Sequence, residues 1–168
     1  MPSGQSHTFI NLAAYAVLGS VALYVHRQGI FFIGQEDALF FTLGFLVGTV
    51  FLSPDLDLAE GHVNSKRAWG FLGALWVPYG LLFSHRGWSH SWLIGPLTRL
   101  IYLAVMVAVV TGLLHFLLPS VDWPVTSLAF SWSLALPLLV GYYLSQWLHL
   151  IADGVRPDHK MRWKKKRR

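Results

Sequence analysis

The sequence predicts an all-α integral membrane protein with four transmembrane helices plus a short re-entrant or interfacial helical segment. Its 168 residues are 54% hydrophobic and only 12% charged, whereas soluble domains usually carry about 25% charged residues. A small domain buries the smallest share of its surface, so a soluble fold of this length could not hide that much apolar area. Long apolar stretches separated by short polar segments are the second observation.

Five apolar stretches divide the chain, over about residues 9–25, 38–52, 69–83, 92–118 and 125–151. A spanning helix needs about 20 residues, within a range of about 17–25. The third stretch is shorter than that and contains Pro78, a residue that interrupts helices. The third stretch is therefore interpreted as the re-entrant or interfacial segment, and the other four as spans.

The positions of Lys and Arg predict the topology. If the third stretch does not cross, Lys66, Arg67, Arg86 and the basic C-terminal run share one side of the membrane. The opposite side then holds Arg27 and acidic residues. Because basic residues gather on the cytoplasmic side, both termini are expected in the cytoplasm.

The C-terminal end differs in composition from the rest. Residues 1–155 are expected to form one membrane-embedded helical domain, and residues 156–168 a basic cytoplasmic tail that holds most of the Lys and Arg residues. A terminal basic run can bind nucleic acid, but beside a membrane helix it more often marks the cytoplasmic side and meets anionic lipid. Membrane lipids are the expected partners, and no nucleic acid is expected.

This topology is inferred from the positions of Lys and Arg alone. It nevertheless places seven residues of metal-ligand type on one membrane face. A five-helix arrangement would separate the first aspartates from the later histidines. The chain has no cysteine, so a metal would be held by imidazole nitrogen and carboxylate oxygen. The candidate metal ligands are His7, Asp55, Asp57, His85, His90, His149 and Asp153.

Two carboxylates follow the second apolar stretch. Pro54 biases Ser53 away from helix, and Asp55 and Asp57 would point to the same side of an extended segment. There they could bind one metal together or bridge two. The alternative is a hydrophilic turn, which aspartate also favours.

The segment from Ser84 to Ser91 holds two histidines and an arginine. His85 and His90 could converge across a turn at Gly87, with Ser89 as the N-cap of the next helix. Arg86 beside them has the planar fork that grips phosphate or carboxylate. The alternative, an interfacial loop anchored by tryptophan, leaves these three side chains unexplained.

The fifth stretch ends in a helical His–Asp pair. His149 and Asp153 lie at i and i+4 on one helical face, which suits two ligands or a ligand with an orienting carboxylate. A simple helix-terminal pair is the alternative. His7 could complete the set, or could be a solvated terminal histidine. Arg99, about nine residues into the fourth stretch, would either snorkel to the surface or face a polar cavity.

The number of ligands bears on the metal. A tetrahedral zinc site uses four ligands, so the surplus suits two ions, or one ion with a general base and supporting partners. Nitrogen and oxygen ligands fit zinc, the expected metal, and also manganese or iron.

Several motifs in combination resemble one family of small bacterial membrane proteins, which are classed as metal-binding proteins of unknown function and are similar to inner-membrane metal-dependent hydrolases. The resemblance implies a bacterial plasma (inner) membrane location and metal ligation at the residues named above. The motifs are Pro54-Asp55-Leu56-Asp57-Leu58, Arg67-Ala68-Trp69-Gly70, Trp76-Val77-Pro78-Tyr79, His85-Arg86-Gly87-Trp88-Ser89-His90-Ser91, Gly95-Pro96 with Arg99, and Met1-Pro2-Ser3-Gly4 with His7.

The function that these features favour is a membrane-bound metal-dependent hydrolase acting on a phosphoester in a lipid or membrane-associated substrate. Asp57, His90 and Arg86 are the predicted catalytic residues, and an anionic lipid or other phosphate-bearing molecule is the predicted substrate. The alternative is a non-enzymatic metal-binding membrane protein, such as a transporter, sensor or storage subunit, because ionisable residues near a membrane also mark ion paths. A purely structural His–Asp cluster is a third possibility.

Overall fold

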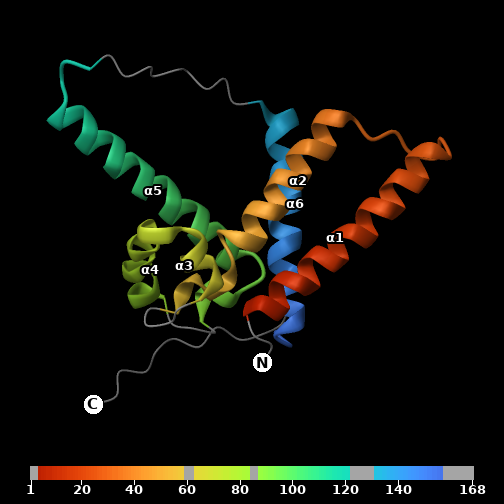
Figure 1. The fold of residues 1–168 in the computed structure, drawn as a ribbon, viewed down its shortest axis with the longest axis horizontal. Helices are drawn as coiled ribbons and strands as arrows, with labels where there is room; N and C mark the ends of the chain where they lie inside the picture. The colour runs from red at the N-terminus through yellow and green to blue at the C-terminus, as the bar shows by residue number, and fades with distance from the viewer. Residues whose placement is uncertain (1–3, 59–62, 84–86, 122–130, 157–168) are drawn as a thin grey trace.

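The computed structural model describes residues 4–58, 63–83, 87–121 and 131–156, and these are helical with no β-strand. The all-α prediction is therefore confirmed. Figure 1 shows four long helices that diverge from a shared lower end: α1 Gly4–Arg27, α2 Gln35–Val50, α5 Ile94–Leu117 and α6 Trp132–Ala152. Between α2 and α5 lie short elements, in which η denotes a 3₁₀-helix: η1 Pro54–Asp57, α3 Asn64–Ala68, η2 Gly70–Trp76, α4 Val77–Leu82 and η3 Trp88–His90.

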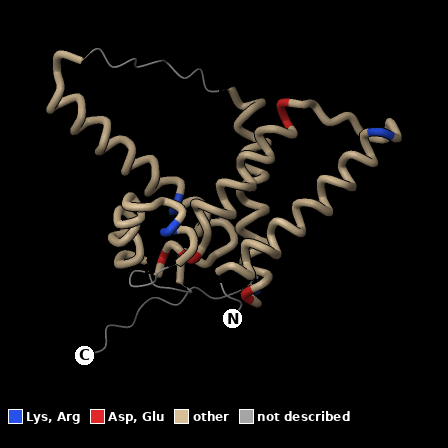
Figure 2. Tube along the Cα trace, viewed as in Figure 1, with Lys and Arg blue, Asp and Glu red and all other residues tan. Residues whose placement is uncertain are grey.

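Four helical segments are long and apolar enough to cross a membrane, as the sequence predicted: α1, α5, α6 and the segment Gln35–Asp57, which includes α2 and η1. In Figure 2, charged residues lie mainly at the helix ends and around the short elements, and the lengths between carry almost none. No residue is buried in the most apolar window of α5. Its apolar side chains therefore form an outer surface that lipid can solvate.

Glycines bring α2 and α6 into close contact (Figure 1). A Cβ atom on Gly44 would lie 1.9 Å from the carbonyl oxygen of Leu138, and one on Gly48 would lie 2.1 Å from Oγ of Ser145. Gly44 and Gly48 lie four residues apart on one face of α2, which is the spacing that allows membrane helices to approach closely. This contact fixes α6 against α2 along most of their length.

The third apolar stretch forms η2 and α4, which together are shorter than the four candidate spans. Pro78 is the second residue of α4, where its missing N–H leaves no hydrogen bond unmade. It therefore begins a helix and does not interrupt one. Trp76 and Tyr79 are fully buried and form a core cluster with Leu56 of η1 and Tyr142 of α6. The stretch thus anchors η1, the segment that carries both aspartates.

Two helix boundaries differ from the predicted apolar stretches in ways that matter for the site. α1 includes residues from Gly4 onward, so His7 is on the helix and not before it. α5 begins at Ile94, two residues later than predicted, which leaves the residues after His90 in a turn. The start of the fifth stretch, residues 125–130, lies outside the described residues, and α6 runs from Trp132.

Candidate metal centre

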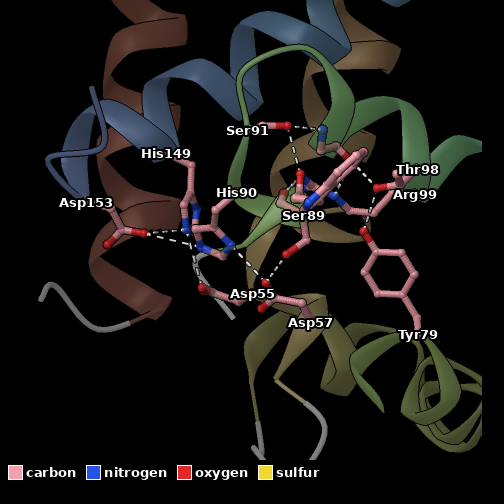
Figure 3. A network of polar contacts seen from close by, with 12 residues as sticks. Asp55, Asp57, Tyr79, Ser89, His90, Ser91, Thr98, Arg99, His149 and Asp153 are labelled. Atoms are coloured by element: carbon pink, nitrogen blue, oxygen red, sulfur yellow. Dashed lines mark hydrogen bonds and ion pairs between the residues drawn. The ribbon is translucent and has the colours of Figure 1, made fainter. Parts of the chain in front are cut away.

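Five of the candidate ligands lie together at the end where the long helices meet, and Figure 3 shows four of them converging. His7 is near the start of α1, and Asp55 lies in η1. His90 is the last residue of η3. His149 is in the last turn of α6, and Asp153 is the residue directly after that helix. Segments far apart in the sequence therefore each contribute a ligand-type side chain.

One candidate ligand group consists of His7, His149 and Asp153. The two imidazole rings are stacked, with centroids 3.9 Å apart and an interplanar angle of 15°. Nε2 of His7 lies 3.2 Å from Oδ1 of Asp153, and Nε2 of His149 lies 3.5 Å from Oδ2 of Asp153. Both histidines are buried. The pairing of His149 with Asp153 matches the i, i+4 spacing on which the sequence prediction depended.

A second group consists of Asp55, His90 and Asp153. Nε2 of His90 lies 3.9 Å from Oδ2 of Asp153. Asp55 connects the two groups, because its Oδ1 lies 3.4 Å from Nε2 of His149. Asp153 belongs to both groups and has two carboxylate oxygens. The cluster therefore has the donors for one ion, or for two ions that share Asp153.

Asp57 is buried beside this cluster but belongs to neither group. Its Oδ2 lies 2.9 Å from Nδ1 of His90 and also accepts a hydrogen bond from Oγ of Ser89 (Figure 3). When Nδ1 of His90 carries the proton, it donates to Asp57, and Nε2 presents its lone pair to the side of Asp153. Carboxylates in this position orient metal-binding imidazoles and raise their basicity.

The expectation that Asp55 and Asp57 point to the same side is wrong. The segment is not extended but forms the 3₁₀-helix η1. With three residues per turn, side chains two residues apart point about 120° apart. Asp55 therefore faces His149, and Asp57 faces His90 from another direction.

Ser89 is likewise not the N-cap that was expected. It is fully buried and its hydroxyl binds Asp57. Near the start of α5 the backbone N–H of Gly95 instead donates to Oγ of Ser91, at 2.9 Å. The residue at the N-cap position of α5 is Leu93, which makes no capping hydrogen bond with its side chain.

Several atoms of the cluster that could bind a metal make no hydrogen bond within the described part of the chain. There, Nε2 of His149 and both carboxylate oxygens of Asp153 are buried without a hydrogen bond, whereas buried polar atoms are nearly always paired. Burial alone would raise the pKa of Asp153, but His149, His7 and His90 together outweigh this and hold that pKa below its ordinary value. An ionised, buried carboxylate surrounded by imidazoles suits a divalent cation, and these nitrogen and oxygen ligand atoms fit zinc, manganese or iron.

Residues 2–163 match the model of a protein family described as "Uncharacterized metal-binding protein (DUF2227)". The chain belongs to this family. The resemblance inferred from the motifs is thereby confirmed, and metal binding is the property that the family description and the cluster geometry share. A curated relative from Aquifex aeolicus (strain VF5), described as "Uncharacterized protein", is 42% identical over 69 residues, which are 41% of this chain and 48% of the relative. The match thus covers about half the length of that relative. No solved structure matches the chain.

In this DUF2227 member, Arg99 takes neither of the two roles considered from the sequence. Its side chain is 0% exposed, so it does not snorkel, and its donors are directed to the protein. It donates to the carbonyl oxygens of Leu52 at 3.2 Å and Ser89 at 2.9 Å, and to Oε1 of Gln146 at 2.5 Å. Arg99 therefore joins the segment after α2, the η3 turn that carries His90, and α6 one turn before His149.

Further buried polar residues support the cluster, and sequence reasoning did not assign them a role. Nδ2 of Asn11 donates to Oγ1 of Thr49 at 3.2 Å and to the carbonyl oxygen of Ser145 at 3.0 Å. Nε2 of Gln146 donates to the carbonyl oxygen of Gly48 at 2.9 Å. A sequence signal existed for two of these residues, because Asn11 lies four residues after His7 and Gln146 three residues before His149, on the same helical faces.

Two predicted site residues, His85 and Arg86, lie outside the described residues. His26 is at the opposite end of α1, where its Nδ1 accepts a hydrogen bond from the backbone N–H of Ile33. The predicted roles of His85 and Arg86 therefore stay predictions.

Proposed function

We propose that this protein is a membrane-bound metal-dependent hydrolase that cleaves a phosphoester in a lipid or membrane-associated substrate. The observation that supports this proposal is the pair of candidate ligand groups that share Asp153. Enzymes that hydrolyse phosphoesters commonly hold two metal ions a few ångströms apart through shared carboxylates.

The proposed ligands are His7, His149 and Asp153 in one group and Asp55 and His90 beside Asp153 in the other, and zinc is the expected ion, with manganese or iron as alternatives. A divalent cation bound there supplies Lewis-acid polarisation of a phosphoryl oxygen and lowers the pKa of a water molecule. His85 is retained as a further predicted ligand.

The predicted catalytic residues would act through the geometry of His90. Asp57 would hold the Nδ1 proton of His90 in place, so that the Nε2 lone pair stays directed at the ion that His90 is proposed to bind. This changes the expected role of Asp57 from ligand to positioning residue. Arg86 is proposed to hold the phosphate of the substrate, as its guanidinium fork suits that anion.

We also propose that the cluster faces the cytoplasm of a bacterial cell whose inner membrane contains the four helices, with residues 156–168 against anionic lipid. The chain has no cysteine, so single-cysteine variants label without background. In intact cells, a membrane-impermeant maleimide should label Glu36→Cys and leave Gln5→Cys unlabelled until the membrane is opened. The reverse pattern would invert the proposed orientation.

The hydrolase proposal is tested with full-length protein purified in detergent and loaded with zinc, manganese or iron. Metal content is measured by elemental mass spectrometry, and phosphate release is measured from phosphatidic acid vesicles and from soluble aryl phosphoesters. Asp153→Asn should lose bound metal and activity together. Asp37→Asn, the same substitution in the exposed first turn of α2, should retain both. Metal bound in full with no phosphoester cleaved would contradict the proposal.

One observation favours a second candidate, a non-enzymatic metal-binding protein. The polar cavity beside His7, Asp55 and His149 has a volume of only about 10 Å³, which is room for about one water molecule. A substrate would have to approach from its edge. Slow metal exchange in the purified protein, together with no hydrolysis of any phosphoester tested, would support this second function.

A further inference from the structure

A second cavity lies directly beside the polar one. It is an open groove of about 350 Å³ between the start of α1 and the end of α2, within the size range of ligand sites. Thr8 and Asn64 line both the groove and the polar cavity that contains His7, Asp55 and His149. The two cavities therefore share a wall, and a molecule in the groove reaches the neighbourhood of the candidate metal centre.

The wall of the groove is partly polar and partly apolar. Phe9, Leu12 and Val50 form the apolar part, and the side chains of Phe9 and Leu12 are 74% and 42% exposed. Gln5, Thr8 and Asn64 form the polar part. Both helices that border the groove are candidate membrane spans. Acyl chains are the apolar molecules that surround such helices, and a chain with a polar group at one end matches both parts of the wall.

We propose that this groove binds one acyl chain of a membrane phospholipid, with its phosphate at the wall shared by Thr8 and Asn64, next to the candidate metal centre. The proposal rests on the proposed hydrolase function and narrows its substrate class to phosphate-bearing lipids. The groove would select the substrate by its chain, and the amide of Asn64 offers N–H donors to its phosphate, whereas the Thr8 hydroxyl beside it donates to the carbonyl oxygen of Gly4 at 3.1 Å. The narrow polar cavity is then no obstacle, because the lipid stays in the groove and only the phosphate approaches the ligands.

The binding site is tested without relying on activity. The full-length protein is placed in nanodiscs with a phosphatidic acid that carries a diazirine in its acyl chain, and the labelled peptides are mapped by mass spectrometry. Wild-type protein should be labelled preferentially in the peptides that contain Phe9 to Leu12 and Val50. Leu12→Trp fills the groove and should reduce this labelling several-fold. Val17→Trp, an equal change at an exposed α1 position outside the groove, should leave it unchanged.

Folding is checked separately through the thermal melting and metal content of both tryptophan variants, which should equal those of wild type. A Leu12 variant that melts early is replaced by Val50→Phe, which narrows the same groove from α2. Equal labelling of the groove peptides in the Leu12 and Val17 variants, or labelling spread evenly over all four helices, would overturn the proposal.

Hydrolysis assays separate the failure of this proposal from failure of the proposed function. The filled groove should raise KM for phosphatidic acid vesicles and leave cleavage of a soluble aryl phosphoester unchanged. If wild-type protein cleaves both substrates and Leu12→Trp changes neither, the enzyme remains and the lipid groove is wrong. If wild-type protein cleaves neither but labels specifically in the groove, the lipid site remains and the hydrolase function is wrong.

Discussion

Replacing Asp57 with Asn or Ala distinguishes an orienting carboxylate from a metal ligand. Oδ2 of Asp57 lies 2.9 Å from Nδ1 of His90 and accepts a hydrogen bond from Ser89. Asn keeps an acceptor oxygen but loses the negative charge, and Ala removes both. Loss of such an outer carboxylate typically weakens metal binding by about 10–100-fold, which corresponds to about 1.4–2.8 kcal/mol of binding free energy. We expect Asn near the lower value and Ala near the upper.

The assay is a zinc titration of the metal-stripped protein in competition with a chromophoric chelator, with elemental mass spectrometry for the stoichiometry. Both Asp57 variants should keep the wild-type number of zinc ions and bind them more weakly, whereas His90→Ala should lose one equivalent or the whole metal content. Glu36→Gln, at the far end of α2, is the control and should bind as wild type does. If Asp57→Asn loses the same amount of zinc as His90→Ala, Asp57 is itself a ligand and the reasoning is refuted.

Three further predictions concern stability and pH. Gly48→Ala should lower the free energy of unfolding in detergent by about 1–3 kcal/mol, because a Cβ there would lie 2.1 Å from Oγ of Ser145. The control, Gly19→Ala, should not lower it, because nothing lies within 4 Å of a Cβ at that position. Equal shifts of the melting temperature in the two variants would contradict the close contact of α2 and α6. Arg99→Met should both lower the melting temperature and weaken zinc binding, since each buried carbonyl left unpaired costs about 1–3 kcal/mol. A zinc affinity equal to that of wild type would show that Arg99 does not position the ligands. Acidification from about pH 7.5 to about pH 5.5 should weaken metal binding, because imidazole binds the metal only when neutral, while the lowered pKa of Asp153 keeps that carboxylate ionised. A metal dissociation constant that stays the same over this range would contradict histidine ligation.

The spans and the gathering of ligand-type residues at one end followed from the sequence for physical reasons. Bilayer thickness fixes the length of a spanning helix, so the apolar stretches predicted α1, α2, α5 and α6. The helical period places residues four apart on one face, so the approach of His149 to Asp153 was also predictable. A chain with few polar residues in its apolar stretches has few places where a cluster can form.

The predictions that were wrong depend on backbone conformation or on contacts between residues far apart in the sequence. Asp55 and Asp57 point apart because the segment is a 3₁₀-helix. The few residues between Pro54 and the next loop give no sequence signal that favours a 3₁₀-helix over an extended strand. The role of Arg99 depends on Leu52 and Gln146, each 47 residues away in the sequence. Local periodicity contains no information about such pairs, and only the packing of α2, α5 and α6 brings them together.

The ligands come from opposite ends of the chain, with His7 near the start of α1 and Asp153 just after α6. During synthesis His7 emerges early and Asp153 only after the last helix. A chain that is truncated, or whose last helix has not inserted, therefore has the first ligand without its partners. A ligand that binds only the folded state stabilises it by RT ln(1 + [L]/Kd). Metal binding would thus act as a quality check, because only chains that have formed all four long helices would gain this stabilisation, and incomplete ones would be left to proteolysis.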